Sequence, residues 1–296
     1  MILALLLACG DPDRPPETPQ PAAHQQPAAP NQPGGMLRGP DPSAKTLHRA
    51  RSTDGRTWQP LPGVYAQAAS SPQLVLVEGE AWTYYVEHGE YLMRLPLDGG
   101  APERVELPSE PGLVVDPCVV ALGPHDYRLY TIFQDLAIDP GALPVSVVRS
   151  ARSSDGLRWR PEPGERLRGP YVDPDVVAVD GGWRMYLTRG ANEVLSAFSA
   201  DGLSWSMEPG ARLSGGGVSS TALHGGLWWM FFHEPGGVGV ATSPDGLNFS
   251  TPTRELLRPS GEQLGVESPS VLEWDGGWWM VYASYTAEAM RELGPR

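Results

Sequence analysis

Between residues 46 and 285 the chain alternates short apolar runs with polar turns, and a helical period is scarcely found. One unit recurs: a short apolar run, a turn rich in Gly, and a run rich in aromatic residues. In one copy, residues 176–179 are apolar, residues 180–182 read Asp-Gly-Gly, and residues 183–187 read Trp-Arg-Met-Tyr-Leu. Short runs bounded by such turns predict β-strands joined as hairpins. Five copies start near residues 72, 117, 174, 220 and 269.

A second motif, Ser-x-Asp-Gly-x-x-Trp/Phe, alternates with the first. Its four copies occupy residues 52–58, 153–159, 199–205 and 243–249. Asp-Gly between two β-rich runs favours a hairpin, because Gly supplies a positive φ and Asp bonds to the turn backbone. We therefore interpret the aspartates of this motif as structural, and we expect its aromatic residue to pack between neighbouring sheets.

The two motifs together predict an all-β fold, a five-bladed β-propeller. Successive copies of the first motif are 45, 57, 46 and 49 residues apart, which suits one four-stranded blade each. The fifth copy reaches Tyr285 without an outer hairpin, whereas the turn around Asp54 has no inner one. We expect the segment near residues 46–60 to complete the blade that begins at residue 267, because ring closure removes exposed sheet edges.

Composition separates this folded part from the residues before it. The 296 residues include 22 Lys and Arg against 35 Asp and Glu, a net charge of −13, so we expect no nucleic-acid partner. Residues 10–44 are rich in Pro, Gln and Ala and have almost no large apolar side chains. Such a segment cannot bury enough surface to fold. It is expected to be a disordered tether, followed by one propeller domain over residues 45–296, acting as a monomer.

The first nine residues form an apolar run that ends at Cys9 and is too short to span a bilayer. They resemble the end of a bacterial lipoprotein signal peptide, with residues 6–9 as the lipobox. The resemblance implies cleavage before Cys9, a lipid on that cysteine and a place in the bacterial cell envelope. The charged region expected of such a peptide is missing, so we expect the true start upstream. An ordinary apolar stub is the alternative.

The chain has two cysteines, and lipidation of Cys9 leaves Cys118 without a disulfide partner. Cys118 reads as a buried strand residue. Six histidines with no tight pairing give no zinc signature. We therefore expect no cofactor and no metal site, and a structural calcium ion in the channel is left open.

Several short motifs resemble those of the five-bladed propeller glycoside hydrolases. They are Asp-Pro at residues 116–117 and 173–174, Glu-Ser-Pro at 267–269, and the Ser-x-Asp-Gly turns. The similarity points to family 43, with its arabinanases and xylosidases, and to the wider group that contains invertase and levansucrase. It covers about residues 46–285. It implies a carbohydrate ligand or substrate and, for an active enzyme, hydrolysis of glycosidic bonds with inversion.

The resemblance also implies three catalytic residues. In this family an Asp base, an Asp modulator and a Glu acid come from successive blades, which gives Asp116, Asp173 and Glu267 these roles. The chain departs from that pattern. The family has its acid in the blade after the second Asp-Pro, but residues 218–220 of that blade read Val-Ser-Ser here, and Glu267 lies one blade further along the chain. Glu234, which ends the second strand of the blade without an acid, is the alternative.

Polar and aromatic groups at the ends of the second strands are expected to bind the substrate, because they suit a polyhydroxylated ligand. These residues are His88, Asp135, Arg189, His233, Glu234 and Tyr285. Asp116 and Asp173 have an alternative role, that of capping a turn, whereas Glu267 and Glu234 have the alternative of solvated residues on the rim. Two other functions therefore remain open: a propeller that binds a glycan without cleaving it, and a propeller that binds proteins.

Overall fold

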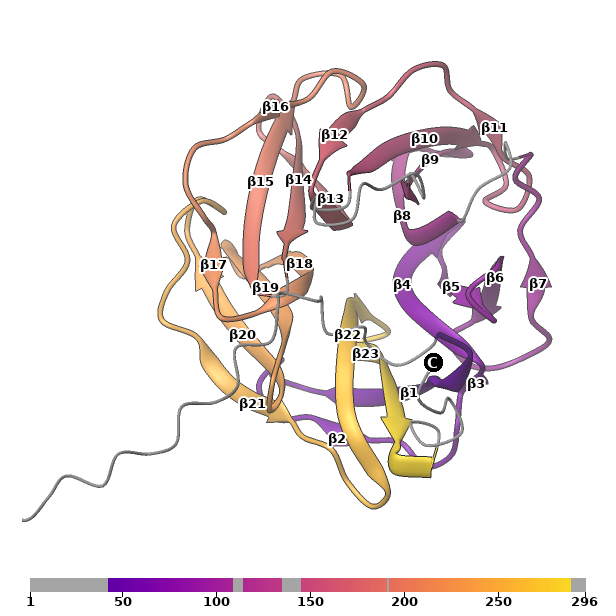
Figure 1. The fold of residues 1–296 in the computed structure, drawn as a ribbon, viewed down its shortest axis with the longest axis vertical. Helices are drawn as coiled ribbons and strands as arrows, with labels where there is room; N and C mark the ends of the chain where they lie inside the picture. The colour runs from indigo at the N-terminus through magenta and orange to yellow at the C-terminus, as the bar shows by residue number, and fades with distance from the viewer. Residues whose placement is uncertain (1–41, 109–113, 135–144, 191, 289–296) are drawn as a thin grey trace, which may run out of the picture. The chain divides into compact units, whose positions relative to one another are not determined.

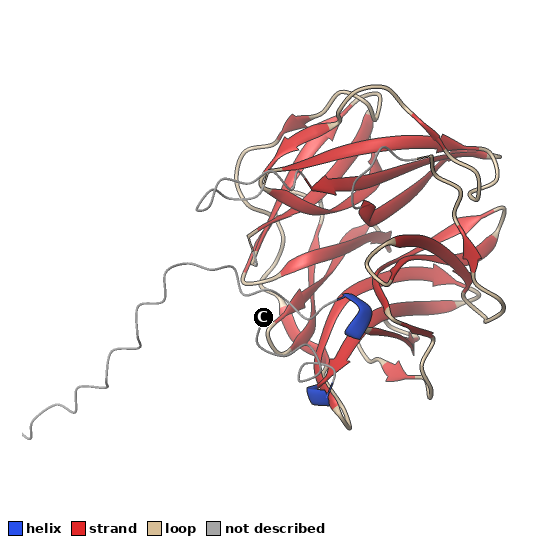
Figure 2. Ribbon diagram, turned by 45° about the vertical axis from the view of Figure 1, so that its right-hand side comes forward, coloured by secondary structure: helices blue, strands red, loops and turns tan. Residues whose placement is uncertain are grey.

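The computed structural model describes residues 42–108, 114–134, 145–190 and 192–288, which lie in one compact unit spanning Gly39–Arg296. Within these residues, five antiparallel sheets surround a central axis, so the predicted all-β five-bladed propeller is confirmed (Figure 1). Strands make up nearly all of the regular structure (Figure 2). The described residues contain no helix that is long and apolar enough to cross a membrane. Cys9 and most of the predicted tether lie outside them.

We number the blades I to V in chain order of their innermost strands. Blade I contains β4 (Ala69–Val77), β5 (Glu80–Glu87), β6 (Tyr91–Pro96) and β7 (Glu103–Arg104). Blade II contains β8 (Val114–Gly123), β9 (Asp126–Gln134), β10 (Ser146–Ser153), β11 (Arg160–Pro161) and β12 (Leu167–Gly169). Blade III contains β13 (Tyr171–Val179), β14 (Gly182–Arg189), β15 (Glu193–Ser199), β16 (Ser206–Met207) and β17 (Leu213–Ser214).

Blade IV contains β18 (Gly217–His224), β19 (Leu227–Glu234), β20 (Gly237–Ser243) and β21 (Thr253–Leu257). Blade V joins both ends of the folded chain: β22 (Gln263–Trp274), β23 (Gly277–Thr286), β1 (Thr46–Ser52), β2 (Gln59–Pro60) and β3 (Ala66–Gln67). A short 3₁₀ turn, η1 (Pro42–Ala44), precedes β1. Strand β1 pairs with β23 from Thr46 opposite Ser284 to Ser52 opposite Trp278. The expected ring closure is therefore confirmed.

Aromatic side chains of the Ser-x-Asp-Gly turns join neighbouring blades, as predicted. Each one meets an aromatic ring of the preceding blade in an edge-on arrangement, and the ring centroids are 5.8 to 6.4 Å apart. The pairs are Trp58–Phe231, Trp159–Tyr84, Trp205–Tyr130 and Phe249–Tyr186. In three of them the tyrosine hydroxyl also donates a hydrogen bond to the glycine carbonyl of the turn.

The aspartates of these turns are structural, as expected. Asp54 Oδ1 accepts hydrogen bonds from the backbone N–H groups of Arg56 and Thr57 at 2.8 and 2.7 Å. These bonds hold the pKa of Asp54 well below its usual range. The corresponding aspartates at 155, 201 and 245 make the same pair of backbone contacts. These four carboxylates are thus committed to their own turns.

The head of every innermost strand carries a β-bulge, and its bulged residue has a left-handed backbone with φ between 47° and 53°. The five residues are Ser71, Asp116, Asp173, Val218 and Ser268. Non-glycine residues rarely adopt this conformation, and a bulge redirects the side chain next to it. Because the same bulge occurs in all five blades, the five bulged residues occupy equivalent positions around one end of the central axis.

The residue two positions after each bulged residue connects its blade to the next one. Its side chain accepts a hydrogen bond from a backbone N–H of the neighbouring innermost strand, and the five bonds together form a circle around the axis. The pairs are Val119 to Gln73, Val176 to Cys118, Thr221 to Asp175, Val271 to Ser220 and Leu74 to Ser270. We call this the inner ring. Cys118 is buried, as expected.

Candidate active site

The bulged heads of the innermost strands surround a cavity of about 110 Å³. Residues from all five innermost strands line this cavity. These strands surround the central axis of the ring (Figure 1). The lining of the cavity includes Asp116 and Asp173, two of the three predicted catalytic residues, and also Asp175. The blade heads therefore bring carboxyl groups together at the mouth of the axis.

Asp116 and Asp173 lie on adjacent blades and are in contact. Asp116 Oδ1 accepts a hydrogen bond from Ser71 Oγ at 2.8 Å, and its Oδ2 accepts one from the backbone N–H of Asp173 at 3.4 Å. Both aspartates keep some exposure to solvent, although protein surrounds them densely. Both can therefore still be reached by a ligand.

The two aspartates differ in how strongly they hold a proton. Burial raises the pKa of Asp116, while the bonds from Ser71 and from the Asp173 backbone oppose that shift. The pKa of Asp173 is raised well above its usual value, first by burial and then by the negative charge of Asp116. When one proton is shared by the pair, it therefore resides on Asp173, and Asp116 is the charged member.

Glu267 lies on β22 of blade V and is separated from Asp116 and Asp173 by a blade on either side of the ring. Its side chain is buried, and its negative charge contributes to the raised pKa of Asp173. Glu267 Oε1 forms an ion pair with Lys45 Nζ, and the two side chains are 11% and 15% exposed. We call Asp116, Asp173 and Glu267 the carboxylate cluster.

Lys45 comes from the chain just before β1, and its backbone is fixed at two points. Its N–H bonds to the carbonyl of Pro42 at 3.2 Å, and its carbonyl accepts the N–H of Ala69 at 3.0 Å. Its positive charge opposes the raised pKa values of both Asp116 and Asp173. Lys45 therefore places a positive charge beside the carboxylate cluster, and the sequence analysis did not single it out.

Two of the predicted substrate-binding residues join this cluster. His233 at the end of β19 is mostly buried; burial lowers its pKa, and the charge of Glu267 opposes that shift. Tyr285 on β23 is partly exposed; burial raises its pKa, and Glu267 raises it further. Both side chains thus lie within the electrostatic reach of Glu267. The site therefore includes an imidazole and a phenol near Glu267.

The other predicted binding residues are placed elsewhere or not described. Glu234 is 3% exposed, forms an ion pair with Arg254 and accepts the backbone N–H of Glu255 at 2.7 Å. It is thus held against β21 by structural contacts. Arg189 is exposed and pairs with Glu193 of the adjacent strand. His88 is exposed in a turn. Asp135 lies outside the described residues.

Comparison with solved structures places the fold among glycoside hydrolases. A thermostable family-43 glycoside hydrolase matches 74% of this chain and 88% of its own, with a TM-score of 0.59 and 15% identity. An exo-1,5-α-L-arabinanase from a bovine ruminal metagenomic library matches 74% and 89%, with a TM-score of 0.58 and 13% identity. The chain has the five-bladed propeller fold of these enzymes.

A third match is the GH43_1 enzyme of Xanthomonas citri in complex with xylose. The match covers 72% of this chain and 80% of that one, with a TM-score of 0.53 and 12% identity. No protein-family model and no curated protein sequence matches the chain. The chain shares the propeller fold of these three enzymes at 12–15% sequence identity.

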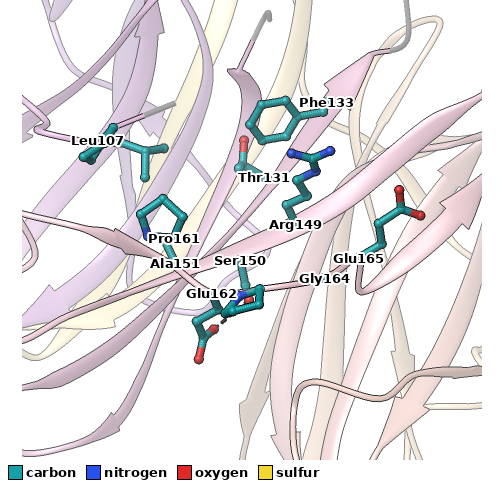
Figure 3. A pocket seen from close by; sticks show the side chains of 12 residues that line it. Leu107, Thr131, Phe133, Arg149, Ser150, Ala151, Pro161, Glu162, Gly164 and Glu165 are labelled. Atoms are coloured by element: carbon teal, nitrogen blue, oxygen red, sulfur yellow. Dashed lines mark hydrogen bonds between the residues drawn. The ribbon is translucent and has the colours of Figure 1, made fainter. Parts of the chain in front are cut away.

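The glycosidase-like propeller has a second, larger cavity of about 570 Å³ along β9, β10 and the loop after β11 (Figure 3). Arg149 stacks over the ring of Phe133 there, 4.8 Å from its centroid. The carboxylate of Glu162 in its wall is bound by Ser150 and Arg128. The carboxylate of Glu162 therefore has a structural role, because it holds Ser150 and Arg128. The aspartates whose pKa values burial raises, Asp116, Asp173 and Asp175, line the cavity at the axis instead, which makes the carboxylate cluster the candidate active site.

Sequence reasoning missed two residues at the axis of the glycosidase-like propeller. Asp175 follows Asp173 by two positions in Asp-Pro-Asp, a spacing that places both on one face of a regular strand and could have drawn attention to it. Lys45 has no such signal, because it reaches the cluster only through ring closure. Among the described residues no group of three or more His, Cys, Asp or Glu could hold a metal ion.

Proposed function

We propose that the protein hydrolyses glycosidic bonds with inversion at the carboxylate cluster. The observation that carries this proposal is the pKa of Asp173, which burial and the neighbouring Asp116 raise, with Glu267 in a blade that is not adjacent to either aspartate. Inverting glycosidases need a protonated acid on one side of the sugar and a carboxylate base on the other, with a water molecule between base and sugar. In this ring the acid side is formed by blades II and III, which carry Asp116 and Asp173, and the base side by blade V, which carries Glu267.

The proton affinities favour roles that differ from those implied by sequence resemblance. Asp173 is the general acid, because burial and the charge of Asp116 favour the protonated form of its carboxyl. Asp116 is the modulator that raises the pKa of Asp173. Glu267 is the general base, because it carries its negative charge in an ion pair with Lys45. Asp173 donates its proton to the leaving-group oxygen, and Glu267 takes a proton from the attacking water.

We propose a carbohydrate as the substrate. The xylose complex of a structurally similar enzyme and the glycoside hydrolase fold support this class of ligand. Tyr285 and His233 stand on the Glu267 side of the cluster, where an aromatic face and a ring nitrogen can stack against a sugar and bond to its hydroxyls. We propose that each of these residues binds the sugar placed between Glu267 and Asp173, with the protein acting as a monomer.

We also propose that the protein is anchored in the bacterial cell envelope by a lipid on Cys9. The lipobox-like residues 6–9 and the tether-like composition of residues 10–44 support it. In a bacterial host, the full chain is expected to label with a radioactive fatty acid and to sediment with membranes. A Cys9→Ser variant is expected to do neither. Membrane sedimentation of that variant at the wild-type level contradicts the anchor.

The catalytic proposal is tested by screening the full-length protein on aryl glycosides and on plant and microbial polysaccharides. Asp173→Asn is expected to lower kcat by about 10²- to 10⁴-fold, the usual contribution of a general acid. Asp155→Asn is the matched control, because that carboxylate is committed to its turn. Turnover that Asp173→Asn leaves unchanged rules out the proposed acid.

Glycan binding without cleavage is the second candidate function. Val218 stands at the bulged head of blade IV, where the family pattern has its acid, and Lys45 occupies one carboxylate oxygen of Glu267. Both observations favour it. In this case no substrate is turned over, and the protein binds a glycan on an array with an affinity that Asp173→Asn and Glu267→Gln leave intact.

A further inference from the structure

The phenol ring of Tyr285 reaches across blade V toward the central axis. Tyr285 lies on β23, and its register partner on the innermost strand β22 is Gly265 (Figure 1). A Cβ atom added to Gly265 would lie 2.4 Å from both Cζ and Oη of Tyr285, and 2.6 Å from its Cε1. The hydroxyl end of the ring therefore fills the space that a side chain at position 265 would occupy.

The backbone at Gly265 does not itself require a glycine. Its φ lies outside the left-handed region, so an alanine there causes no backbone strain. What leaves no room for a larger residue is the ring of Tyr285, because a Cβ closer than 3.0 Å to another atom forces one of the two to move. The atoms that it meets are the free end of a side chain, so the ring is expected to move and the strand to stay.

Gly265, Tyr285 and Glu267 share one face of blade V. Residues two apart on a strand point to the same face, and so do register partners on neighbouring antiparallel strands. The pairing is regular over this stretch, with Gly265 opposite Tyr285 and Glu267 opposite Ala283. The phenol therefore lies diagonally beside the carboxylate of Glu267, whose charge contributes to the raised pKa of Tyr285.

The ion pair of Lys45 and Glu267 lies next to this ring. Lys45 directly precedes Thr46, which pairs with Ser284, the neighbour of Tyr285 in the chain. Both members of the ion pair are largely buried, whereas Tyr285 is partly exposed. A ligand that approaches Glu267 from the solvent can therefore contact the phenol.

We propose that Gly265 is a positioning residue, which holds the phenol of Tyr285 over the innermost strand as the contact surface for the sugar beside Glu267. The inference rests on the proposed function, in which Tyr285 binds the sugar. A phenol offers an apolar face for stacking and a hydroxyl for hydrogen bonding, which together suit a polyhydroxylated ligand. A ring already packed on the backbone of Gly265 need not be ordered when the sugar binds, and such preorganisation increases affinity.

A double-mutant cycle in the full-length protein tests the inference. Gly265→Ala is expected to displace the ring and to raise KM for 4-nitrophenyl glycosides, and Kd for glycans on an array, about tenfold, with kcat within about twofold of the wild type. Tyr285→Ala is expected to produce a similar rise. The variant that combines both changes should show no further rise, because the added Cβ then meets no ring.

Gly239→Ala is the matched control. Gly239 is the register partner of Phe232 in blade IV, its φ is also outside the left-handed region, and an added Cβ would lie 2.5 Å from Cζ of that ring. Phe232 is fully buried, so the control is expected to lower stability in urea and to leave KM unchanged.

Two results overturn the role of Gly265. One is a wild-type KM and Kd in Gly265→Ala, and the other is a combined variant whose KM rises by the product of the two single effects, since independent sites behave in this way. Absence of both turnover and glycan binding in the wild type rejects the proposed function itself. The two failures are therefore distinguishable.

Discussion

The ammonium of Lys45 contacts the carboxylate of Glu267, so a residue from the start of the folded chain completes a site whose other member comes from its end. This contact depends on the closure of blade V by β1, which follows Lys45 directly. The pairing of β1 with β23 therefore closes the ring and also brings Lys45 into the candidate active site.

The role of Lys45 can be tested by changing its charge. Lys45→Met leaves Glu267 as a buried carboxylate without its cation, and such a loss costs about 3–5 kcal/mol when a buried pair is broken. We expect a large loss of stability and of kcat, measured by urea unfolding and by turnover. Lys45→Arg preserves the positive charge and is the control. If Lys45→Met matches the wild type in both measurements, the ion pair has no role.

Asp116 is expected to set the alkaline limit of activity. The general acid must be protonated, so activity falls as the pH rises through the pKa of Asp173. The charge of Asp116 raises that pKa, and Asp116→Asn removes the charge. The alkaline limb of the kcat profile should therefore move to lower pH, while Asp54→Asn, in a remote turn, leaves it in place. A limb that stays or moves to higher pH argues against Asp116 as modulator.

Asp175 is expected to make stability depend on pH. Its pKa is about 7 in the folded protein and near 4 in an unfolded chain, so the folded state binds the proton more tightly. The stability gained in this way is complete below about pH 4 and is lost as the pH rises to about 7. Asp175→Asn should thus gain stability relative to the wild type over that interval, by up to about 4 kcal/mol. Urea unfolding at both ends of the interval measures the difference, and a constant difference contradicts it.

Close contact between blades predicts different costs for two glycines with positive φ. An added Cβ at Gly202 would lie 2.5 Å from Arg128 Nη1 and 2.8 Å from Tyr130 Oη, both in the preceding blade. At Gly181 it would meet nothing within 4 Å. Alanine at either position is strained, but Gly202→Ala is expected to lose about 1–3 kcal/mol more than Gly181→Ala. Thermal unfolding compares them, and equal losses would show that the blades are not tightly joined there.

The ring architecture could be predicted from the sequence because the responsible signals are local and repeated. Each Asp-Gly turn fixes a hairpin, and its aromatic residue three positions later, such as Trp159, meets the preceding blade. Closure by β1 followed from counting hairpins at the two ends. The hairpins depend on neighbours in sequence, and the closure was deduced from their number, which is why both could be identified without the structure.

The chemistry of the site could be predicted only in part. The Asp-Pro motifs identified Asp116 and Asp173 through their resemblance to a motif of the propeller glycoside hydrolases, and both residues lie at bulged blade heads. Lys45 leaves none, since its contact with Glu267 joins opposite ends of the chain. The roles of the acids were also not accessible, because proton affinity depends on burial and on neighbouring charges.

The proposed mechanism is tested most directly by following hydrolysis with proton NMR and identifying the first sugar anomer released. The full-length wild type should release the anomer of inverted configuration, and Asp173→Asn should release none at a measurable rate on a substrate with a poor leaving group. A retained anomer, an unchanged rate in Asp173→Asn, or no turnover of any glycoside by the wild type contradicts hydrolysis by inversion at the carboxylate cluster.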